Sequence, residues 1–329
     1  MTPLRPKGRY EYAMEISSPT PIDNSSGPSS DPSALLRPNP VAERISWVVF
    51  WLIHVVCLTA VWTGFSTRAV VIGLALFWLR MFAITGGYHR YFSHRTYKTS
   101  RWFQFVLAVL GTTTVQKGPL WWASTHRKHH KFSDTPEDVH SPIQRGFWYS
   151  HVGWVTSGDH ITTDLNWIRD FAKFPELLWL GRYHFVPPLV LAGLCGLFAG
   201  WSGLVVGFGW STVMGWHATF TINSLSHVFG KRRYETGDTS RNNWALALLT
   251  MGEGWHNNHH HYQNSVNQGF YWWEIDITYY LLRGLSAVGI VWDLRKPPRH
   301  MLVRNLVGGP AETAAAGDDD SPAAISDAA

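Results

Sequence analysis

Long apolar runs alternate along the chain with polar stretches rich in histidine. A helix needs about 20 apolar residues to cross the hydrocarbon core of a bilayer. Four runs approach or reach that length, at residues 45–64, 69–87, 185–200 and 203–224. Only FSTR separates the first two runs, and only Trp201 and Ser202 separate the last two. Links this short permit only antiparallel hairpins, so the pattern predicts an all-α integral membrane protein with four transmembrane helices in two hairpins.

A fifth apolar stretch, residues 102–115, is shorter than the others and is expected to lie at or partly within the membrane interface. Residues 1–40 are rich in Ser, Pro and Asn and lack the apolar segment of a cleavable signal peptide. Residues 306–329 are small and acidic with no aromatic residue. The composition therefore predicts a membrane domain at residues 41–305 between two disordered tails.

Charge sets the expected orientation of this domain. Only 16% of the residues are charged, 19 are tryptophan, and the formal net charge is +5. The basic residues are not gathered into a patch with interleaved aromatics, so no nucleic-acid partner is expected. The two hairpin tips carry only Arg68 between them, whereas the other face carries a dozen basic residues: Arg37, Arg44, Arg90, Arg95, Lys98, Arg101, Arg127, Lys128, Lys131, Lys231, Arg232 and Arg233. The positive-inside rule then places both termini and all histidine clusters on the cytoplasmic side.

Two cysteines, Cys57 and Cys195, each lie inside an apolar run. They can form neither a disulfide framework nor a thiolate metal site. Any bound metal must therefore use nitrogen and oxygen ligands.

Three histidine clusters are the main chemical signal: HRYFSH at 89–94, HRKHH at 126–130 and HNNHH at 256–260. Two chance copies of H-x-x-H-H in such a chain have a probability on the order of one in a thousand. On a helix, positions i, i+3 and i+4 share one face, so each H-x-x-H-H is expected to present three imidazoles in one direction. His89 and His94 lie about 140° apart on an α-helix, which suits two neighbouring metals better than one.

The fourth run ends with Asn223 and His227, which share one helical face at its cytoplasmic end. Adding His227 to the three clusters gives nine imidazoles and one amide. One zinc ion takes four ligands, so the set predicts two open metal sites rather than one structural site. Imidazole suits zinc, copper, iron and nickel, so the ligands alone do not identify the metal.

These motifs, in this order between paired apolar runs, resemble the membrane fatty acyl desaturases, most closely the stearoyl-CoA (acyl-CoA delta-9) branch in its bacterial form. The supporting segments are HRYFSHRTYKTS, HRKHHKFSDTPEDVHSP, GFWYSHVGW, NSLSHVFG, GEGWHNNHH and NQGFYWWEIDITYYLLRGLSAVGIVWDLRKPP. The resemblance covers about residues 45–298. It implies a cytoplasmic helical cap with a di-iron centre held by His89, His94, His126, His129, His130, His227, His256, His259 and His260, with Asn223 reaching one iron through water.

The same resemblance implies the reaction. Two iron ions and dioxygen would remove two hydrogens from a saturated acyl chain, with a cis double bond expected near the ninth carbon. No haem, flavin or NAD motif is present, so two electrons must come from a partner such as a cytochrome b5-like protein, or a ferredoxin with its reductase. The expected location is the bacterial inner membrane. Met81 and Phe77, two and three turns before His89, are expected to line the acyl tunnel, where bulk would set chain length.

The carrier of the acyl chain stays open between CoA and a membrane lipid. Animal acyl-CoA enzymes hold the CoA head with Arg-Asp and Arg-Lys pairs, where this chain has Ser124 and Thr125 and, later, Ser157 to Asp159. Four other basic residues could replace them: Lys117, Arg145, Arg169 and Lys173.

Other functions on the same residues stay open as well. A hydroxylase could use the same di-iron scaffold, since the chemistry differs only in whether oxygen returns to the chain. A membrane haem or metal carrier would place paired histidines at mid-depth in the spans, whereas these lie at the cytoplasmic ends. A zinc-dependent membrane hydrolase would need far fewer than nine ligands.

The remaining histidines receive weaker expectations. His261 lies about 100° from His260, off the shared face, and is expected to face solvent or the surroundings of the metal. His140 could touch metal or substrate, and His54, His151, His184 and His217 are expected to be structural. The carboxylates expected to orient the metal-binding histidines are Asp134, Glu137, Asp138, Asp238 and Glu253.

Overall fold

The computed structural model describes residues 40–309, with side chains from Ser46 onward. Both predicted tails lie almost wholly outside the described residues, at 1–39 and 310–329. The predicted end of the membrane domain, residue 305, falls inside the described residues. The chain keeps contact with the rest of the protein beyond it, because the backbone N–H of Val307 donates to the carbonyl oxygen of Arg233 at 2.8 Å.

Helices make up most of the described chain, with long irregular segments between α12 and α13 and between α14 and α15. Its first half contains α2 (Pro40–Leu58), α3 (Ala60–Thr63), α4 (Thr67–Phe82), the π-helix η1 (Ala83–Ser93), α5 (Arg101–Thr112), α6 (Pro119–Phe132), α7 (Pro142–Arg145), the π-helix η2 (Tyr149–Gly153) and α8 (Trp154–Thr156). Its second half contains the 3₁₀ helix η3 (Leu165–Trp167), α9 (Arg169–Ala172), α10 (Pro175–Arg182), α11 (Val186–Ser202), the π-helix η4 (Gly203–Trp210), α12 (Ser211–Val228), α13 (Trp244–Leu249), α14 (His256–His261), α15 (Ile277–Ala287) and the 3₁₀ helix η5 (Arg299–Leu302). Two short strands, β1 (Lys98–Thr99) and β2 (Val291–Trp292), pair antiparallel with Lys98 opposite Trp292.

Side-chain caps fix several helix starts. The hydroxyl of Ser66 accepts a hydrogen bond from the backbone N–H of Ala69 at the start of α4, at 3.2 Å. The hydroxyl of Ser100 accepts one from the backbone N–H of Phe103 at the start of α5, also at 3.2 Å. Asn243 and Asp276 cap α13 and α15 in the same way. Such caps satisfy backbone N–H groups that have no partner within the helix.

Three described helical segments are long and apolar enough to cross a membrane: Ser46–Thr63, Thr67–Ser93 and Val186–Val228. The third contains a reversal, because Ala199 and Gly200 have non-helical dihedrals and Gly200 has φ of +60°. A Cβ added to Gly203 would lie 2.1 Å from the carbonyl oxygen of Cys195, which shows that η4 folds back against α11. The predicted third and fourth apolar runs therefore lie on two separate arms of this segment.

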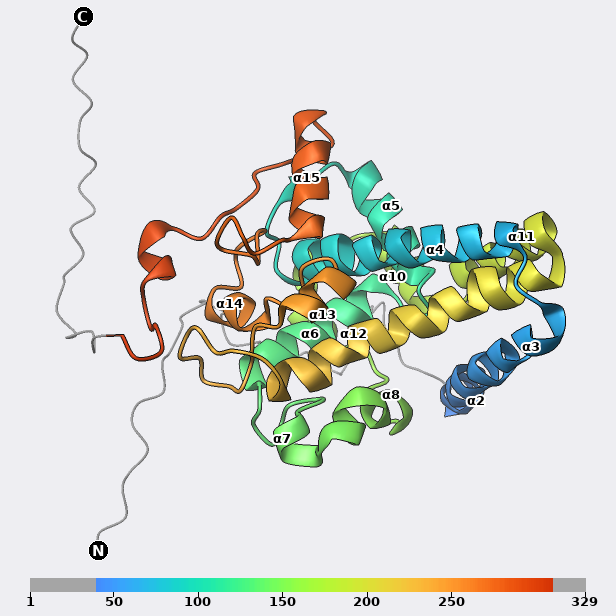
Figure 1. The fold of residues 1–329 in the computed structure, drawn as a ribbon, viewed down its shortest axis with the longest axis horizontal. Helices are drawn as coiled ribbons and strands as arrows, with labels where there is room; N and C mark the ends of the chain where they lie inside the picture. The colour runs from blue at the N-terminus through green and yellow to red at the C-terminus, as the bar shows by residue number, and fades with distance from the viewer. Residues whose placement is uncertain (1–39, 310–329) are drawn as a thin grey trace, which may run out of the picture.

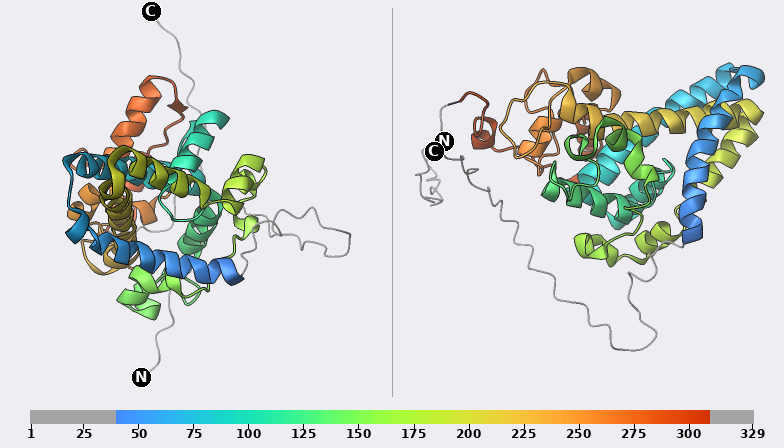
Figure 2. Two further views of the ribbon diagram at one scale, coloured as in Figure 1. Left: turned by 90° about the vertical axis from the view of Figure 1, so that its right-hand side faces the viewer. Right: turned by 90° about the horizontal axis from the view of Figure 1, so that it is seen from below.

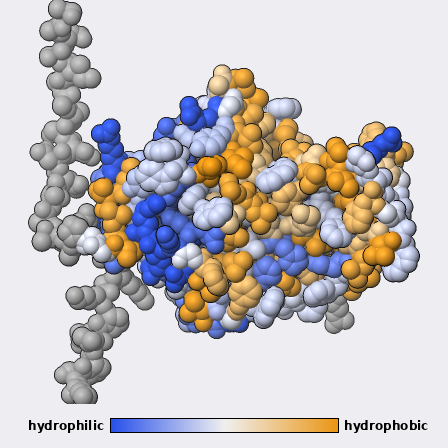
Figure 3. All heavy atoms as spheres, viewed as in Figure 1, coloured by the Kyte–Doolittle hydropathy of each residue, from blue (hydrophilic) through white to orange (hydrophobic). Residues whose placement is uncertain are grey.

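The molecule divides into an apolar helical bundle and a polar region that carries the short helices. Figure 1 shows α4 and α12 running along the bundle, with α11 and the α2–α3 turn at one end and α14 toward the other. Figure 2 gives two further views of this arrangement. Hydrophobic residues cover most of the bundle in Figure 3, and hydrophilic residues gather over the other end. Val61, Trp62 and Leu197 are 81%, 80% and 78% exposed on the bundle, as expected for side chains that face lipid.

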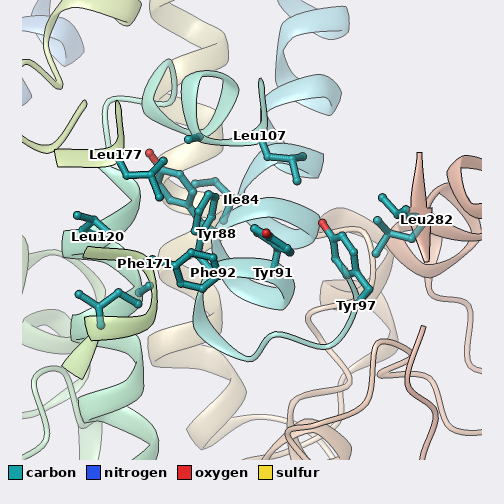
Figure 4. Packing of buried hydrophobic residues seen from close by; sticks show 14 of the residues in the cluster. Ile84, Tyr88, Tyr91, Phe92, Tyr97, Leu107, Leu120, Phe171, Leu177 and Leu282 are labelled. Carbon is teal, nitrogen blue, oxygen red and sulfur yellow. The ribbon is translucent and has the colours of Figure 1, made fainter. Parts of the chain in front are cut away.

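The main core cluster lies where the bundle joins the polar region. Figure 4 shows Tyr88 and Phe92 of η1 among Leu107 of α5, Leu120 of α6 and Phe171 of α9. The hydroxyl of Tyr88 also hydrogen-bonds that of Thr112 at 2.9 Å. This packing holds η1, and the histidines that it carries, against α5 and α6.

Candidate metal centre

The structure gathers the nine predicted histidines into two neighbouring groups, in each of which the candidate ligand atoms lie within 4.8 Å of one another. The five-histidine group consists of His89, His94, His126, His130 and His259. The four-histidine group consists of His129, His227, His256 and His260. The sequence alone left open which histidines belong together.

Each H-x-x-H-H motif is divided between the two groups, and the expectation of three imidazoles pointing one way is wrong. In α6, His126 and His130 join the five-histidine group while His129 joins the other. In α14 the assignment is reversed, since His256 and His260 join the four-histidine group and His259 does not. The reason is helical geometry: i and i+4 differ by about 40°, but i+3 and i+4 differ by about 100°.

His89 and His94 lie in the same group, which also corrects the expectation that they serve two metals. His89 lies near the end of the π-helix η1 and His94 follows directly after it as the C-cap residue, whose backbone N–H donates to the carbonyl oxygen of His89 at 3.2 Å. This i→i+5 bond brings residues five apart nearly above one another. On an α-helix the two side chains would diverge.

Four carboxylates hold histidines by the nitrogen that faces away from the groups. The Nδ1 atoms of His129, His227 and His260 lie 2.9, 3.1 and 2.6 Å from oxygens of Asp138, Asp134 and Asp238. His89 Nδ1 likewise contacts Glu253. When Nδ1–H donates to a carboxylate, Nε2 carries a lone pair and its direction is fixed, as metal-binding histidines require. Glu137, the fifth predicted carboxylate, instead accepts from the hydroxyl of Thr135.

Electrostatics keeps these carboxylates ionised and most of the ligand rings neutral; His129 is the exception, because the charge of Asp138 raises its pKa against the effect of burial. Burial opposes ionisation of Asp138, but the charge and hydrogen bond of His129 prevail and hold the pKa of Asp138 well below its usual range. His260 does the same for the pKa of Asp238. Burial, with neighbouring histidines, lowers the pKa of His130 and His259 well below the ordinary value, so both imidazoles are neutral. Neutral imidazole is the form that binds metal.

The ring nitrogens fit a bound cation. His227 Nε2 lies 3.1 Å from His256 Nε2, and His89 Nε2 lies 3.0 Å from His259 Nε2. The Nε2 atoms of His129 and His260 are buried without a hydrogen-bond partner. Lone pairs that converge in a buried site repel one another, and a metal ion held between them removes that repulsion and satisfies the unpaired atoms.

Two asparagines fix α14, which has only six residues and would be marginal by itself. Asn257 Oδ1 accepts from the backbone N–H groups of Arg233 and Tyr234, each at 2.8 Å. Asn258 donates to Glu274 at 2.9 Å. Both side chains are fully buried. Sequence reasoning missed these roles, although two amides between metal-binding histidines were a visible signal.

The other histidines lie outside the two groups. His261 stacks on Tyr234 with ring centroids 3.9 Å apart and donates to the carbonyl oxygen of Met301 at 2.8 Å. It is therefore buried, and the expectation that it faces solvent or the metal's surroundings is wrong. The ring centroid of His140 lies 4.2 Å from that of His129, and its Nδ1 lies 4.0 Å from a carboxylate oxygen of Asp138. His140 therefore borders the four-histidine group.

Three of the histidines expected to be structural form a hydrogen-bonded series. His54 contacts His217 at 3.2 Å, and His217 contacts His151 at 3.0 Å. His151 continues the series to the hydroxyl of Ser224 at 3.0 Å.

Two further predicted residues lie outside this series. His184 lies beside Phe185, with ring centroids 6.3 Å apart. Asn223 lies on α12 one turn before His227, and its backbone oxygen accepts from Ser150 at 2.9 Å; the water-mediated contact of its side chain stays a prediction.

A small, partly open cavity lies between α4 and α12, lined by Arg80, Met81, Ile84, Thr114, Gln116, Ser211, Thr212, Gly215 and Thr219. Gln116 connects this cavity to the five-histidine group through Trp122. The Oε1 atom of Gln116 accepts a hydrogen bond from the indole N–H of Trp122 at 3.3 Å, and the ring of Trp122 stacks on that of His126 with centroids 4.9 Å apart. Met81, predicted to face a tunnel, lines this cavity. Phe77 packs with Met81 in a neighbouring cluster and is not part of the lining.

The basic residues considered for the carrier head each have their own contacts. Arg145 pairs with Asp159 at 3.4 Å, and Arg169 donates to Asn166 at 2.8 Å. The Nζ atom of Lys117 lies 4.3 Å from the ring centroid of Trp121, and that of Lys173 lies 5.4 Å from the ring centroid of Phe174.

Comparison with known proteins decides the family. The profile of the fatty acid desaturase family matches residues 66–289. The chain belongs to the fatty acid desaturase family. This desaturase is thus an oxidoreductase, and all nine histidines of the two groups lie within the matched region.

The relatives of the desaturase differ in the substrates that their names give. An acyl-CoA 5-desaturase of Anemone leveillei is 37% identical over 285 residues, covering 80% of this chain and 88% of the relative. An sn-1 stearoyl-lipid 9-desaturase of Anabaena variabilis is 38% identical over 258 residues, covering 77% and 94%. A delta-9 desaturase-like protein of Arabidopsis thaliana is 39% identical over 252 residues, covering 74% and 82%.

Proposed function

We propose that this desaturase uses dioxygen and two histidine-bound iron ions to insert a cis double bond near the ninth carbon of a saturated acyl chain. The observation that carries the proposal is the pair of adjacent all-nitrogen groups, five and four imidazoles, with ring nitrogens converging in each. Imidazole ligands suit iron, and two adjacent ions can act on one substrate together. Two of the relatives described above are named as 9-desaturases or delta-9 desaturase-like, which favours that position.

The bound irons would supply activation of dioxygen and removal of hydrogen from the chain. The protein's own residues would do the rest. Asp134, Asp138, Asp238 and Glu253 hold the ligand rings in place. Trp122 stands between the cavity and His126, so a chain that follows the cavity would be held beside the five-histidine group. The apolar surroundings would exclude water while the chain is in place.

The same proposal covers the setting of the enzyme. We infer four spans, the long third segment being divided at Gly200, with both termini and the metal centre in the cytoplasm of a bacterial cell and the hairpin tips outside. Two electrons per turnover would come from a cytochrome b5-like protein, or from a ferredoxin with its reductase. The carrier is either CoA or a membrane lipid, since relatives are named for both.

Expression in a desaturase-deficient bacterial host tests the proposal. Lipid analysis should find new cis-unsaturated chains, with the double bond at the ninth carbon, that depend on the intact histidines. Their appearance first in the CoA pool or first in membrane lipids identifies the carrier. A hydroxylated chain in place of an alkene would show a hydroxylase on this scaffold, and no new product in a host with an electron donor would refute the proposal.

A further inference from the structure

Arg80 is a charged residue inside the apolar bundle. It belongs to α4 within the candidate span Thr67–Ser93, and only 3% of it is exposed. Charged residues within membrane spans are costly and rare, and they mark functional positions more often than structural ones. The sequence showed this signal as a single arginine in an apolar run, yet neither the metal groups nor their carboxylates contact it.

All the hydrogen-bond partners of Arg80 are neutral. Its Nε donates to the carbonyl oxygen of Leu76 at 3.3 Å, and Nη1 donates to that of Thr113 at 3.2 Å. Nη1 also donates to the hydroxyl of Thr212 at 2.9 Å, and Nη2 to the hydroxyl of Ser211. Among the described residues, no salt bridge includes Arg80. The guanidinium is therefore held by hydroxyl and carbonyl dipoles alone.

These groups form one end of the cavity between α4 and α12. Gln116 and Thr219, joined by a 3.2 Å hydrogen bond, form the end near Trp122 and the metal groups. Arg80 and Thr212 line the other end, and the seven helical steps from Thr212 to Thr219 on α12 span about 10 Å. A hydrocarbon chain that passes the metal groups and enters this cavity would meet the Arg80 cluster with its methyl end.

We propose that Arg80, Ser211 and Thr212 form a polar floor that ends the acyl-binding cavity and sets the longest chain that the enzyme accepts. The inference rests on the proposed function and concerns the substrate's length. A methyl group cannot replace the hydrogen bonds of a guanidinium. A chain one unit too long must therefore part Arg80 from its hydroxyl partners and leave buried donors unpaired, which is strongly unfavourable.

A polar floor should give a sharper limit than a bulky apolar side chain would. An apolar pocket discriminates against one extra methylene by about tenfold or somewhat more, because its walls can shift. Parting a buried charge from its partners adds to that penalty. The alternative is that Arg80 only ties α4 to α12 and to the end of α5, in which case its removal would lower protein yield without changing product length.

The test is expression in a desaturase-deficient host supplied with an even-numbered series of saturated acyl chains. Arg80→Met keeps an unbranched side chain and removes the charge. It should raise the ratio of longer unsaturated products to the main wild-type product about tenfold or more. Arg80→Lys keeps the charge and should keep the wild-type limit. Arg68→Met is the matched control, because Arg68 lies on the same helix and donates to the carbonyl oxygen of Phe198, but is exposed outside the cavity; it should leave product length unchanged.

A wild-type length distribution from Arg80→Met at normal protein level would overturn the inference. Should that variant fail to accumulate, Thr212→Val removes one hydroxyl at nearly constant volume and should shift the products in the same direction by a smaller factor. Unchanged product length in Thr212→Val would then overturn it. Absence of any unsaturated product from the wild-type protein would instead refute the proposed function on which the inference rests.

Discussion

Four of the nine candidate metal ligands are held by a carboxylate at the ring nitrogen that faces away from the histidine groups. Three of the four residues in the four-histidine group donate to an aspartate: His129, His227 and His260. In the five-histidine group His89 alone contacts a carboxylate, Glu253, which Arg90 also contacts at 3.1 Å. The carboxylates are thus concentrated on one of the two groups.

Replacing one of these aspartates should weaken metal binding. Asp238→Asn removes the negative charge beside His260 Nδ1, and loss of such a partner typically costs 10- to 100-fold in metal affinity, so we expect a loss of about that size. The measurement is metal retained after dialysis against a graded chelator. Glu137→Gln is the control, because Glu137 accepts only from Thr135 nearby and should retain wild-type metal. Equal retention in Asp238→Asn and wild type would contradict the assigned role.

The residue run His259, His260 and His261 offers a second comparison. His260→Gln should lower the bound metal, since His260 is one of four ligand candidates in its group. His261→Gln should leave the metal content unchanged, because His261 contacts Met301 and Tyr234 instead. Metal analysis of the two purified variants decides the matter, and a loss in both would place His261 in the metal site.

The spacing and number of histidines predict which residues meet, but not how they divide. Counting nine imidazoles indicates two sites, and the structure brings the same nine together. The division requires the relative orientation of α6, α14 and η1, which depends on tertiary packing. The stacked position of His261 depends likewise on Tyr234, 27 residues earlier in the chain, which no local pattern reveals.

At the scale of elements, the π-helix η1 is the feature that the sequence pattern concealed. The apolar run before it indicates an ordinary helix, on which His89 and His94 diverge. Packing of Tyr88 and Phe92 against α5, α6 and α9 holds the wider helix in place. Long apolar helices were predictable from composition, whereas a local change of helical pitch depends on contacts that are distant in sequence.

The contact between η1 and α5 should be intolerant of added volume. A Cβ at Gly111 would lie 2.2 Å from the ring of Tyr88, so Gly111→Ala should destabilise the protein by about 1–3 kcal/mol through overpacking. The measurement is thermal unfolding of the purified protein in detergent. Gly193→Ala on α11 is the control, because a Cβ there meets nothing within 4 Å. Equal unfolding temperatures for the two variants would contradict the packing of Tyr88 on α5.

At the scale of the whole molecule, orientation in the membrane follows from the uneven distribution of charge. The exposed tip of the first hairpin includes Phe65, and the exposed basic segment after α12 includes Lys231. The test uses variants in which the two native cysteines are replaced and a membrane-impermeant thiol reagent. The reagent should label Phe65→Cys in intact cells whose outer membrane has been permeabilised. It should label Lys231→Cys only after the cells are lysed. The opposite pattern would reverse the proposed topology.

The central claim is that two groups of histidines hold two irons in one desaturase. The most direct measurement is the metal content of the purified wild-type protein together with its optical spectrum. We expect two irons per chain and no haem absorption. One metal ion per chain, zinc in place of iron, or a haem Soret band would contradict it.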